Sequence, residues 1–262
     1  MKMNNIIITG CSYSQTSGVP RKYIYSSLLK NHRDIKNVKN LSWPGQSNDT
    51  IIRDIKNEIN KGVSNSLFIC QLTHLHRVSH FCTINKKWLD FQPAIINPCP
   101  EIKNDKVQFE IEFYNEKKRP QPGTGNIGSI GIYGAQKWND LKLNEDTVIK
   151  LLDWYETYLM YLYDEEHEFF ELHKKINELT KQIKDSNNEI LYLYWPDVIY
   201  DKSLFNKNNF LSIEGEYSML KWSVKNKLTQ EEDTHLSLEG HSQLGNSILS
   251  YLNMKPQQRQ II

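Results

Sequence analysis

Residues 4–14, NNIIITGCSYS, decide the fold because they join a short apolar strand to a glycine-containing turn. The run from Asn4 to Thr9 is β-branched and apolar at consecutive positions, which is typical of strands buried inside a parallel sheet. Gly10 ends this run. Ser12 follows on a tight turn, so its hydroxyl is expected at the carboxyl edge of the sheet, where open α/β folds bind their ligands.

Strands and helices alternate along the rest of the chain. Apolar runs predict strands at 38–43, 66–72 and 189–195, and helical spacing predicts helices at 49–61, 146–185 (one helix or two) and 238–252. Such alternation favours a mostly parallel sheet that is covered on both faces. The expected fold class is α/β, a three-layer α/β/α, flavodoxin-like arrangement in one domain spanning 1–262.

The regular pattern fails between about Ser79 and Asn144, where prolines and glycines accumulate. A large irregular insertion is expected there, with a short hairpin around 107–114. Long irregular stretches within a compact domain are usually functional. The insertion is therefore expected to form a lid or a binding surface.

Charge and cysteine content exclude several classes of protein. The 32 basic and 31 acidic side chains give a formal net charge of +1, so no overall field attracts nucleic acid or an acidic membrane. No apolar run reaches the roughly 20 residues of a membrane span, and the N-terminal run is too short for a signal peptide. The four cysteines lack the paired spacings of zinc or redox motifs. A cytoplasmic location, with no nucleic-acid or membrane partner, is expected.

A second group of chemically active residues lies near the other end of the chain. Asp233 and His235 share a short acidic segment in front of the last predicted helix, for which Ser237 is the expected N-cap. A carboxylate close to a histidine can accept a hydrogen bond from Nδ1 and leave Nε2 free to take a proton from a serine. Glu232 competes with Asp233 for this orienting role.

Together these two segments resemble the GDSL, or SGNH, hydrolase superfamily. Gly10-Cys11-Ser12 matches the block that carries the nucleophile, and Asp233-Thr234-His235 with Gly240-His241 looks like the block that carries the acid and the base. The resemblance implies a catalytic triad of Ser12, His235 and Asp233. Cys11 stands where the family usually has Asp, and we expect its side chain to point into the core.

The same resemblance implies an oxyanion hole. The family takes one donor from a glycine amide after the second strand, and Pro44-Gly45-Gln46-Ser47-Asn48 resembles that block, with Gly45 as the donor and Asn48 as a further candidate. The family's Gly-x-Asn-Asp block after the third strand is missing here. The third donor is therefore open among Asn48, Gln71 and Thr73.

His74, His76 and Arg77 follow the third predicted strand. His74 and His76 would share one face of an extended segment, as metal ligands can, but no carboxylate or cysteine nearby completes a set, so no metal site is predicted. Arg77 is expected to contact a polar or anionic group of the substrate.

The predicted function is cleavage, or transfer, of a small acyl ester through the triad, with no metal or organic cofactor required. The expected substrate is a small-molecule or carbohydrate ester, and acetyl is the acyl group that the resemblance implies. The alternative is a noncatalytic module that keeps the fold and binds a ligand or a partner through the insertion. An intact Ser12 and His235 favour catalysis, whereas the missing third block favours the alternative.

Overall fold

Four parallel strands form the central sheet of the computed structural model, which describes residues 5–15, 19–32, 35–84, 86–93, 126–127, 130–133, 145–206, 209–230 and 234–253. The strands are β1 (Asn5–Thr9), β2 (Asn37–Asn40), β3 (Ser66–Leu72) and β8 (Glu189–Tyr194), in the order β2-β1-β3-β8. All three pairings are parallel. β1 and β3 occupy the centre, where both faces are covered, which explains their continuous apolar sequences.

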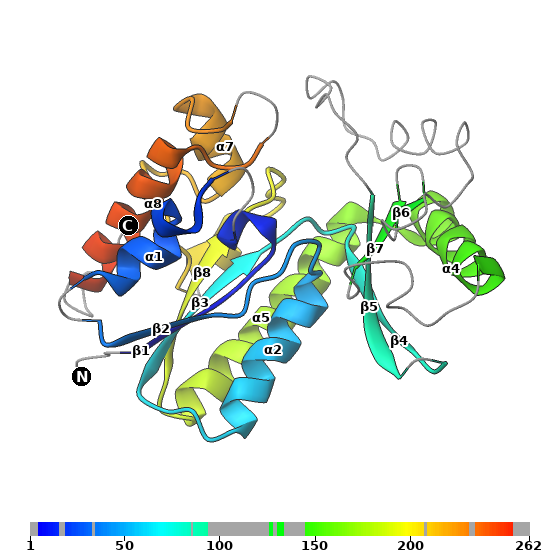
Figure 1. The fold of residues 1–262 in the computed structure, drawn as a ribbon, viewed down its shortest axis with the longest axis horizontal. Helices are drawn as coiled ribbons and strands as arrows, with labels where there is room; N and C mark the ends of the chain where they lie inside the picture. Colours follow the sequence, from blue (N-terminus) through cyan, green and yellow to red (C-terminus); the bar gives the residue numbers. More distant parts are fainter. Residues whose placement is uncertain are drawn as a thin grey trace.

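Helices cover both faces of this sheet, as Figure 1 shows. α2 (Asn48–Asn60) and α5 (Glu165–Asp185) pack on one face, and α1 (Tyr25–Lys30), α7 (Met219–Lys225) and α8 (Leu238–Asn253) lie on the other. Each face has its own apolar core. The short elements are the 3-10 turns Ser12–Ser14 and Arg21–Tyr23 and helix α6 (Ser203–Asn206). The three-layer α/β/α prediction is confirmed.

A second, antiparallel sheet occupies part of the predicted insertion. Its strands are β4 (Val78–Cys82), β5 (Lys87–Pro93), β7 (Ile130–Tyr133) and β6 (Asn126–Ile127), in the order β4-β5-β7-β6. The expectation of an irregular chain is therefore wrong for these residues. It failed because the strands are short and β5 pairs with β7, which is far away in the sequence. The hairpin predicted at 107–114 lies outside the described residues.

The helical segment predicted at 146–185 is divided. α4 (Glu145–Thr157) continues into a π-helical turn (Tyr158–Leu162), and α5 starts afresh at Glu165. Asp164 caps α5, because its side chain accepts a hydrogen bond from the amide of His167 at 2.8 Å. The apolar stripe of α5 is buried, as predicted for core packing.

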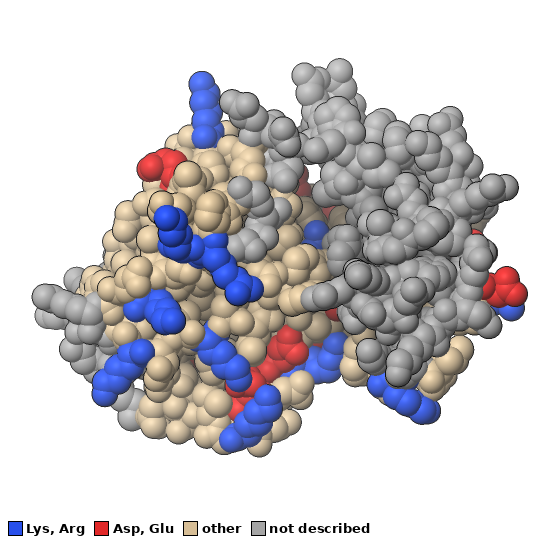
Figure 2. Space-filling view, in the orientation of Figure 1, with Lys and Arg blue, Asp and Glu red and all other residues tan. Residues whose placement is uncertain are grey.

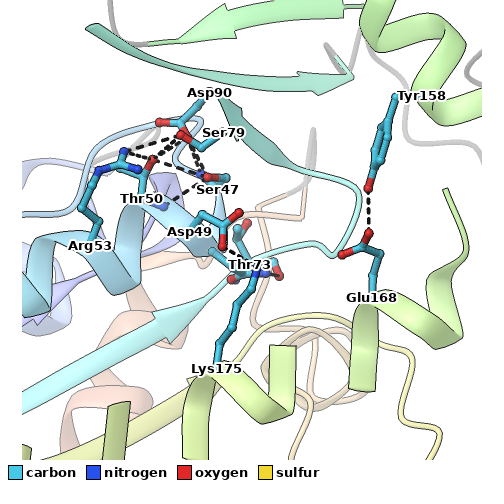
Figure 3. A network of polar contacts seen from close by, with 11 residues as sticks. Ser47, Asp49, Thr50, Arg53, Thr73, Ser79, Asp90, Tyr158, Glu168 and Lys175 are labelled. Atoms are coloured by element: carbon cyan, nitrogen blue, oxygen red, sulfur yellow. Dashed lines mark hydrogen bonds and ion pairs between the residues drawn. The ribbon is translucent and has the colours of Figure 1, made fainter. Parts of the chain in front are cut away.

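A buried carboxylate fastens the second sheet to the first turn of α2 (Figure 3). Asp90 of β5 accepts hydrogen bonds from Ser47 Oγ at 2.7 Å and from Thr50 Oγ1 at 2.6 Å. Arg53 donates to the same Thr50 hydroxyl and lies 4.0 Å from the centroid of the Trp88 ring. The first turn of α2, a helix that packs on the parallel sheet, is therefore also hydrogen-bonded to the antiparallel sheet.

On the face drawn in Figure 2, basic side chains lie scattered over the described part of the molecule, and acidic side chains appear in several separate places, the largest group near the lower centre of the view. Among the helices that the structure describes, none combines the length and the apolar character needed to cross a bilayer.

Candidate active site

Ser12 and His235 meet above the carboxyl edge of the parallel sheet, although 223 positions separate them in the sequence. The distance between Ser12 Oγ and His235 Nε2 is 2.8 Å. Ser12 opens the 3-10 turn that follows β1, and His235 lies just before α8. The amide of Gln230 donates to the carbonyl of His235 at 2.8 Å, which fixes the backbone of the histidine. This spacing allows direct proton transfer between the hydroxyl and the imidazole.

The Ser12 turn is held from below by Gln71, near the end of β3. Gln71 Oε1 accepts hydrogen bonds from the Cys11 amide at 2.9 Å and from Ser14 Oγ at 3.1 Å, and its Nε2 donates to Leu72 O at 2.7 Å. Tyr25 donates to Ser14 Oγ at 2.6 Å, so the network continues into α1. The geometry thus gives Gln71, one of the three candidates for the third oxyanion donor, the role of bracing the turn.

Tyr13 holds the imidazole from the side, a role that the sequence did not reveal. Its ring lies 4.6 Å from that of His235 and stacks on Trp195 at 3.8 Å. Its hydroxyl forms a 3.0 Å hydrogen bond with Thr234 Oγ1, next to His235. Burial raises the pKa of Tyr13 to about 12, so the phenol stays neutral. The one feature of the sequence that could have indicated this role is that Tyr13, an aromatic residue, directly follows the proposed nucleophile.

Gly45 occupies a tight turn in the loop between β2 and α2. Pro44 and Gly45 are its central residues, the Gln46 amide donates to Trp43 O, and Gly45 has a φ of +81°. This is the pattern of a type II turn, which requires glycine at the third position. The Trp43 amide donates to Gly10 O at 3.1 Å, which places this loop against the strand end that leads to Ser12.

Asn48 forms a reciprocal pair with the backbone of Thr73. Its Nδ2 donates to Thr73 O at 3.0 Å, and its Oδ1 accepts from the Thr73 amide at 2.8 Å. Both residues are buried. The pair joins the first residue of α2 to the loop after β3, and it leaves Asn48 one amide hydrogen for another acceptor. The Thr73 hydroxyl is buried without a hydrogen-bond partner in the part of the chain that the structure describes.

Asp233 and Glu232 lie outside the described residues, so the structure does not describe the acid of the predicted triad. Cys11 is fully buried in the core, as expected from the direction of its side chain.

His74, His76 and Arg77 line the loop between β3 and β4. The rings of His74 and His76 stack with centroids 5.3 Å apart, and His74 approaches Tyr13 at 6.2 Å. Burial, and then the charge of Arg77, lowers the pKa of His76 to about 3 and holds that of His74 well below its usual value. Both imidazoles are therefore neutral at physiological pH. No group of three potential metal ligands occurs among the residues that the structure describes.

Comparison with solved structures gives distant similarities. The chain is similar to GDSL-type lipolytic proteins. One structure, of TesA, has a TM-score of 0.47 at 9% identity, with 95% of this chain and 98% of that chain covered. A lipolytic-family G-D-S-L protein from Desulfitobacterium hafniense DCB-2 has a TM-score of 0.42 at 8% identity, with 94% and 97% covered. The esterase EstA from Pseudoalteromonas sp. has a TM-score of 0.43 at 11% identity, with 96% and 100% covered. No protein-family model and no curated protein matches the sequence.

Proposed function

We propose that this chain is a serine hydrolase that cleaves a small acyl ester, with Ser12 as nucleophile and His235 as general base. The observation that carries the proposal is the 2.8 Å distance between Ser12 Oγ and His235 Nε2. A serine hydroxyl is a weak nucleophile until a positioned base takes its proton. The two residues are 223 positions apart in the sequence. The fold brings them together at the carboxyl edge of the sheet, where ligands of such folds bind.

In the first half of the reaction, Ser12 Oγ attacks the ester carbonyl carbon while His235 Nε2 accepts the hydroxyl proton. The tetrahedral intermediate then collapses, the bond to the alcohol breaks, and His235 returns the proton to the departing alkoxide. In the second half, His235 activates a water molecule that releases the acid from the acyl-Ser12 ester. When another alcohol replaces this water, the same steps transfer the acyl group.

Three donors are assigned to the oxyanion of the tetrahedral intermediate. The amides of Ser12 and Gly45 donate no hydrogen bond to any residue within the described ranges. Asn48 keeps one amide hydrogen beyond its pair with Thr73. Donors preorganised around a developing negative charge typically contribute about 10²–10³ in kcat each. The resemblance to the GDSL family implies the same use of Gly45.

Asp233 is assigned to orient His235. A carboxylate that accepts from Nδ1 selects the tautomer in which Nε2 can take the serine proton. Replacing Asp233 by Asn should lower kcat by about 10²–10⁴, whereas Glu232→Gln should leave it within a few-fold of the native value. The opposite result would assign the orienting role to Glu232.

A fluorophosphonate probe, which modifies activated serines, tests the proposal directly. The native protein should be labelled, Ser12→Ala should not, and Ser250→Ala should be labelled like the native protein because Ser250 is exposed on α8. Mass spectrometry of the labelled peptide should place the adduct on Ser12. A native protein that resists labelling would favour the noncatalytic alternative.

Hydrolysis of 4-nitrophenyl acetate tests the base. His235→Ala should lower kcat by several orders of magnitude, because nucleophile and base act as a unit. His167→Ala is the matched control, since His167 is exposed in the first turn of α5. A residual rate close to the native one in His235→Ala would assign the base elsewhere. A series of longer acyl chains should show falling kcat/KM if the acyl group is small.

A further inference from the structure

Arg77 carries a buried positive charge without an acidic partner in the described structure. Only 7% of the residue is exposed, and its Nε and Nη1 have no hydrogen-bond partner within the described ranges. A guanidinium remains charged at physiological pH, and burying a charge without compensation is costly. Buried cations are normally paired. The buried N–H groups of Arg77 are therefore available to an anion that is absent from the described structure.

The position of Arg77 relates it to the proposed catalytic pair. Its amide donates to His74 O at 3.4 Å, which closes the turn after β3. From His74, ring contacts lead to Tyr13 at 6.2 Å and from Tyr13 to His235 at 4.6 Å. The charge of Arg77 also lowers the pKa of Tyr13, His74 and His76. Burial lowers the pKa of the two histidines as well, whereas it raises that of Tyr13. The guanidinium therefore acts electrostatically on the wall of the candidate active site.

The neighbouring His74 and His76 are uncharged and can add hydrogen bonds beside the Arg77 guanidinium. Their low pKa values keep His74 and His76 neutral, so each imidazole offers one N–H donor and one acceptor. In this loop, Arg77 alone supplies positive charge. A guanidinium fork with neutral donors beside it fits the planar geometry of a carboxylate or the oxygens of a phosphate.

We propose that Arg77 binds an anionic group of the substrate, so that the preferred esters carry a carboxylate or a phosphate on their acyl or alcohol part. The inference rests on the proposed ester hydrolysis by Ser12, and it adds a substrate class to that activity. Arg77 supplies the charge and the unpartnered donors, and His74 and His76 line the same loop.

Two pairs of matched esters test this inference with the complete chain. The first pair is 4-nitrophenyl hemisuccinate and its neutral methyl ester, which place the charge on the acyl side. The second is 3-acetoxybenzoate and its methyl ester, which place it on the alcohol side. In at least one pair, native kcat/KM should favour the anion by about tenfold to hundredfold, the range expected for hydrogen bonds to a charged group. Inhibition of neutral-ester hydrolysis by monomethyl succinate and by methyl phosphate should show which anion binds more tightly.

The variants separate recognition from catalysis. Arg77→Gln should abolish the preference for the anion, measured as the ratio of kcat/KM between the two esters of a pair, whereas Arg77→Lys should retain part of that preference because the charge remains. Fluorophosphonate labelling of Ser12 reports whether each variant is folded. The native comparison of anionic with neutral esters decides the inference even if Arg77→Gln does not fold.

Three outcomes overturn the inference in distinguishable ways. Hydrolysis of neutral esters by the native protein without preference for either anion would overturn the role of Arg77 alone. An equal loss for both members of a pair in Arg77→Gln would instead assign Arg77 to the transition state. Absence of both labelling and hydrolysis would overturn the proposed function, and the inference with it.

Discussion

At the residue scale, the Ser12 turn depends on Gly10 having no side chain. A Cβ placed on Gly10 would lie 2.6 Å from Gln71 Oε1, 2.8 Å from Gln71 Cβ and 2.9 Å from Ser14 Oγ. These are atoms of the network that braces the turn. Any side chain at position 10 must therefore displace Gln71, and with it the Cys11 amide that precedes the proposed nucleophile.

We expect Gly10→Ala to reduce both stability and activity. Overpacking of this kind typically costs about 1–3 kcal/mol in the free energy of unfolding, and a shift of the turn should lower kcat by at least about tenfold. Urea unfolding and 4-nitrophenyl acetate hydrolysis measure the two effects. Gly62→Ala is the control: Gly62 has a φ of +82°, and a Cβ added there would meet no atom within 4 Å, so stability should fall while activity remains. Native activity in Gly10→Ala would contradict the bracing role.

The sequence was informative about which residue types the site contains and less so about what each contacts. The Gly-Cys-Ser turn and the distant histidine predicted a pair that lies 2.8 Å apart in the structure. Gln71 was one of three candidates for the third oxyanion donor, and in the structure its Oε1 accepts hydrogen bonds from the Cys11 amide and from Ser14 Oγ. The position of a side chain at a strand end depends on what packs around it, and Tyr13 was missed because a stacking contact leaves no spacing pattern.

At the element scale, the Asn48–Thr73 pair joins α2 to the loop after β3. Asn48→Ala should lower the free energy of unfolding by about 1–3 kcal/mol, because it leaves two buried backbone groups of Thr73 unsatisfied. It should also lower kcat by about 10²-fold if Asn48 donates to the oxyanion. Urea titration and steady-state kinetics measure the two losses. A loss of stability with unchanged kcat would restrict Asn48 to the structural pair.

Glu58 joins α2 to the edge strand β2 by an ion pair whose contribution should vary with pH. Its buried carboxylate lies 2.6 Å from Lys39 Nζ and 2.7 Å from Lys61 Nζ, and these hydrogen bonds lower the pKa of Glu58 from its ordinary value of 4.5. A lowered pKa in the folded state means that the ionised form stabilises the fold. This contribution is present above the unfolded value and disappears as the pH falls through the lowered one.

Glu58→Gln should therefore cost about 1 kcal/mol at neutral pH, since both lysines are largely exposed and partly screened. The difference between variant and native protein should shrink as the pH falls below 4.5, the ordinary value. Urea midpoints measured at several pH values test this. Glu239→Gln, an exposed change in the first turn of α8, should show little effect. A difference that grows on acidification would contradict the assignment.

Elements with strong local patterns were predicted well, and those that depend on distant partners were not. The prediction for 66–72 coincides with β3, and helix 49–61 differs from α2 by one residue at each end. The second sheet was missed because its strands are short and join residues far apart in the sequence. The prediction for 146–185 left one helix or two open, and the break before α5 depends on Asp164, which caps α5 just after the π-helical turn.

At the scale of the whole molecule, the candidate site requires both cores. Ser12 follows the central strand β1. Asn48 is the first residue of α2, which packs on one face of the parallel sheet, and His235 precedes α8, which packs on the other face. Loss of either core should therefore separate Ser12 from His235. We expect activity and helical circular dichroism to disappear at the same urea concentration, within the error of the fits.

Parallel titrations with both probes test this expectation. Tryptophan fluorescence adds a third probe, because Trp195 stacks directly on Tyr13 in the site. Loss of activity at clearly lower urea than loss of secondary structure would mean that the loop carrying His235 opens before the rest of the molecule.

The separation of Ser12 and His235 by 223 positions has a consequence for biosynthesis. A nascent chain that has exposed Ser12 must be extended by more than 200 further residues before it contains His235. The proposed nucleophile therefore lacks its base during that part of translation. The proposed activity can arise only after the segment that carries His235 and α8 has been made and has docked.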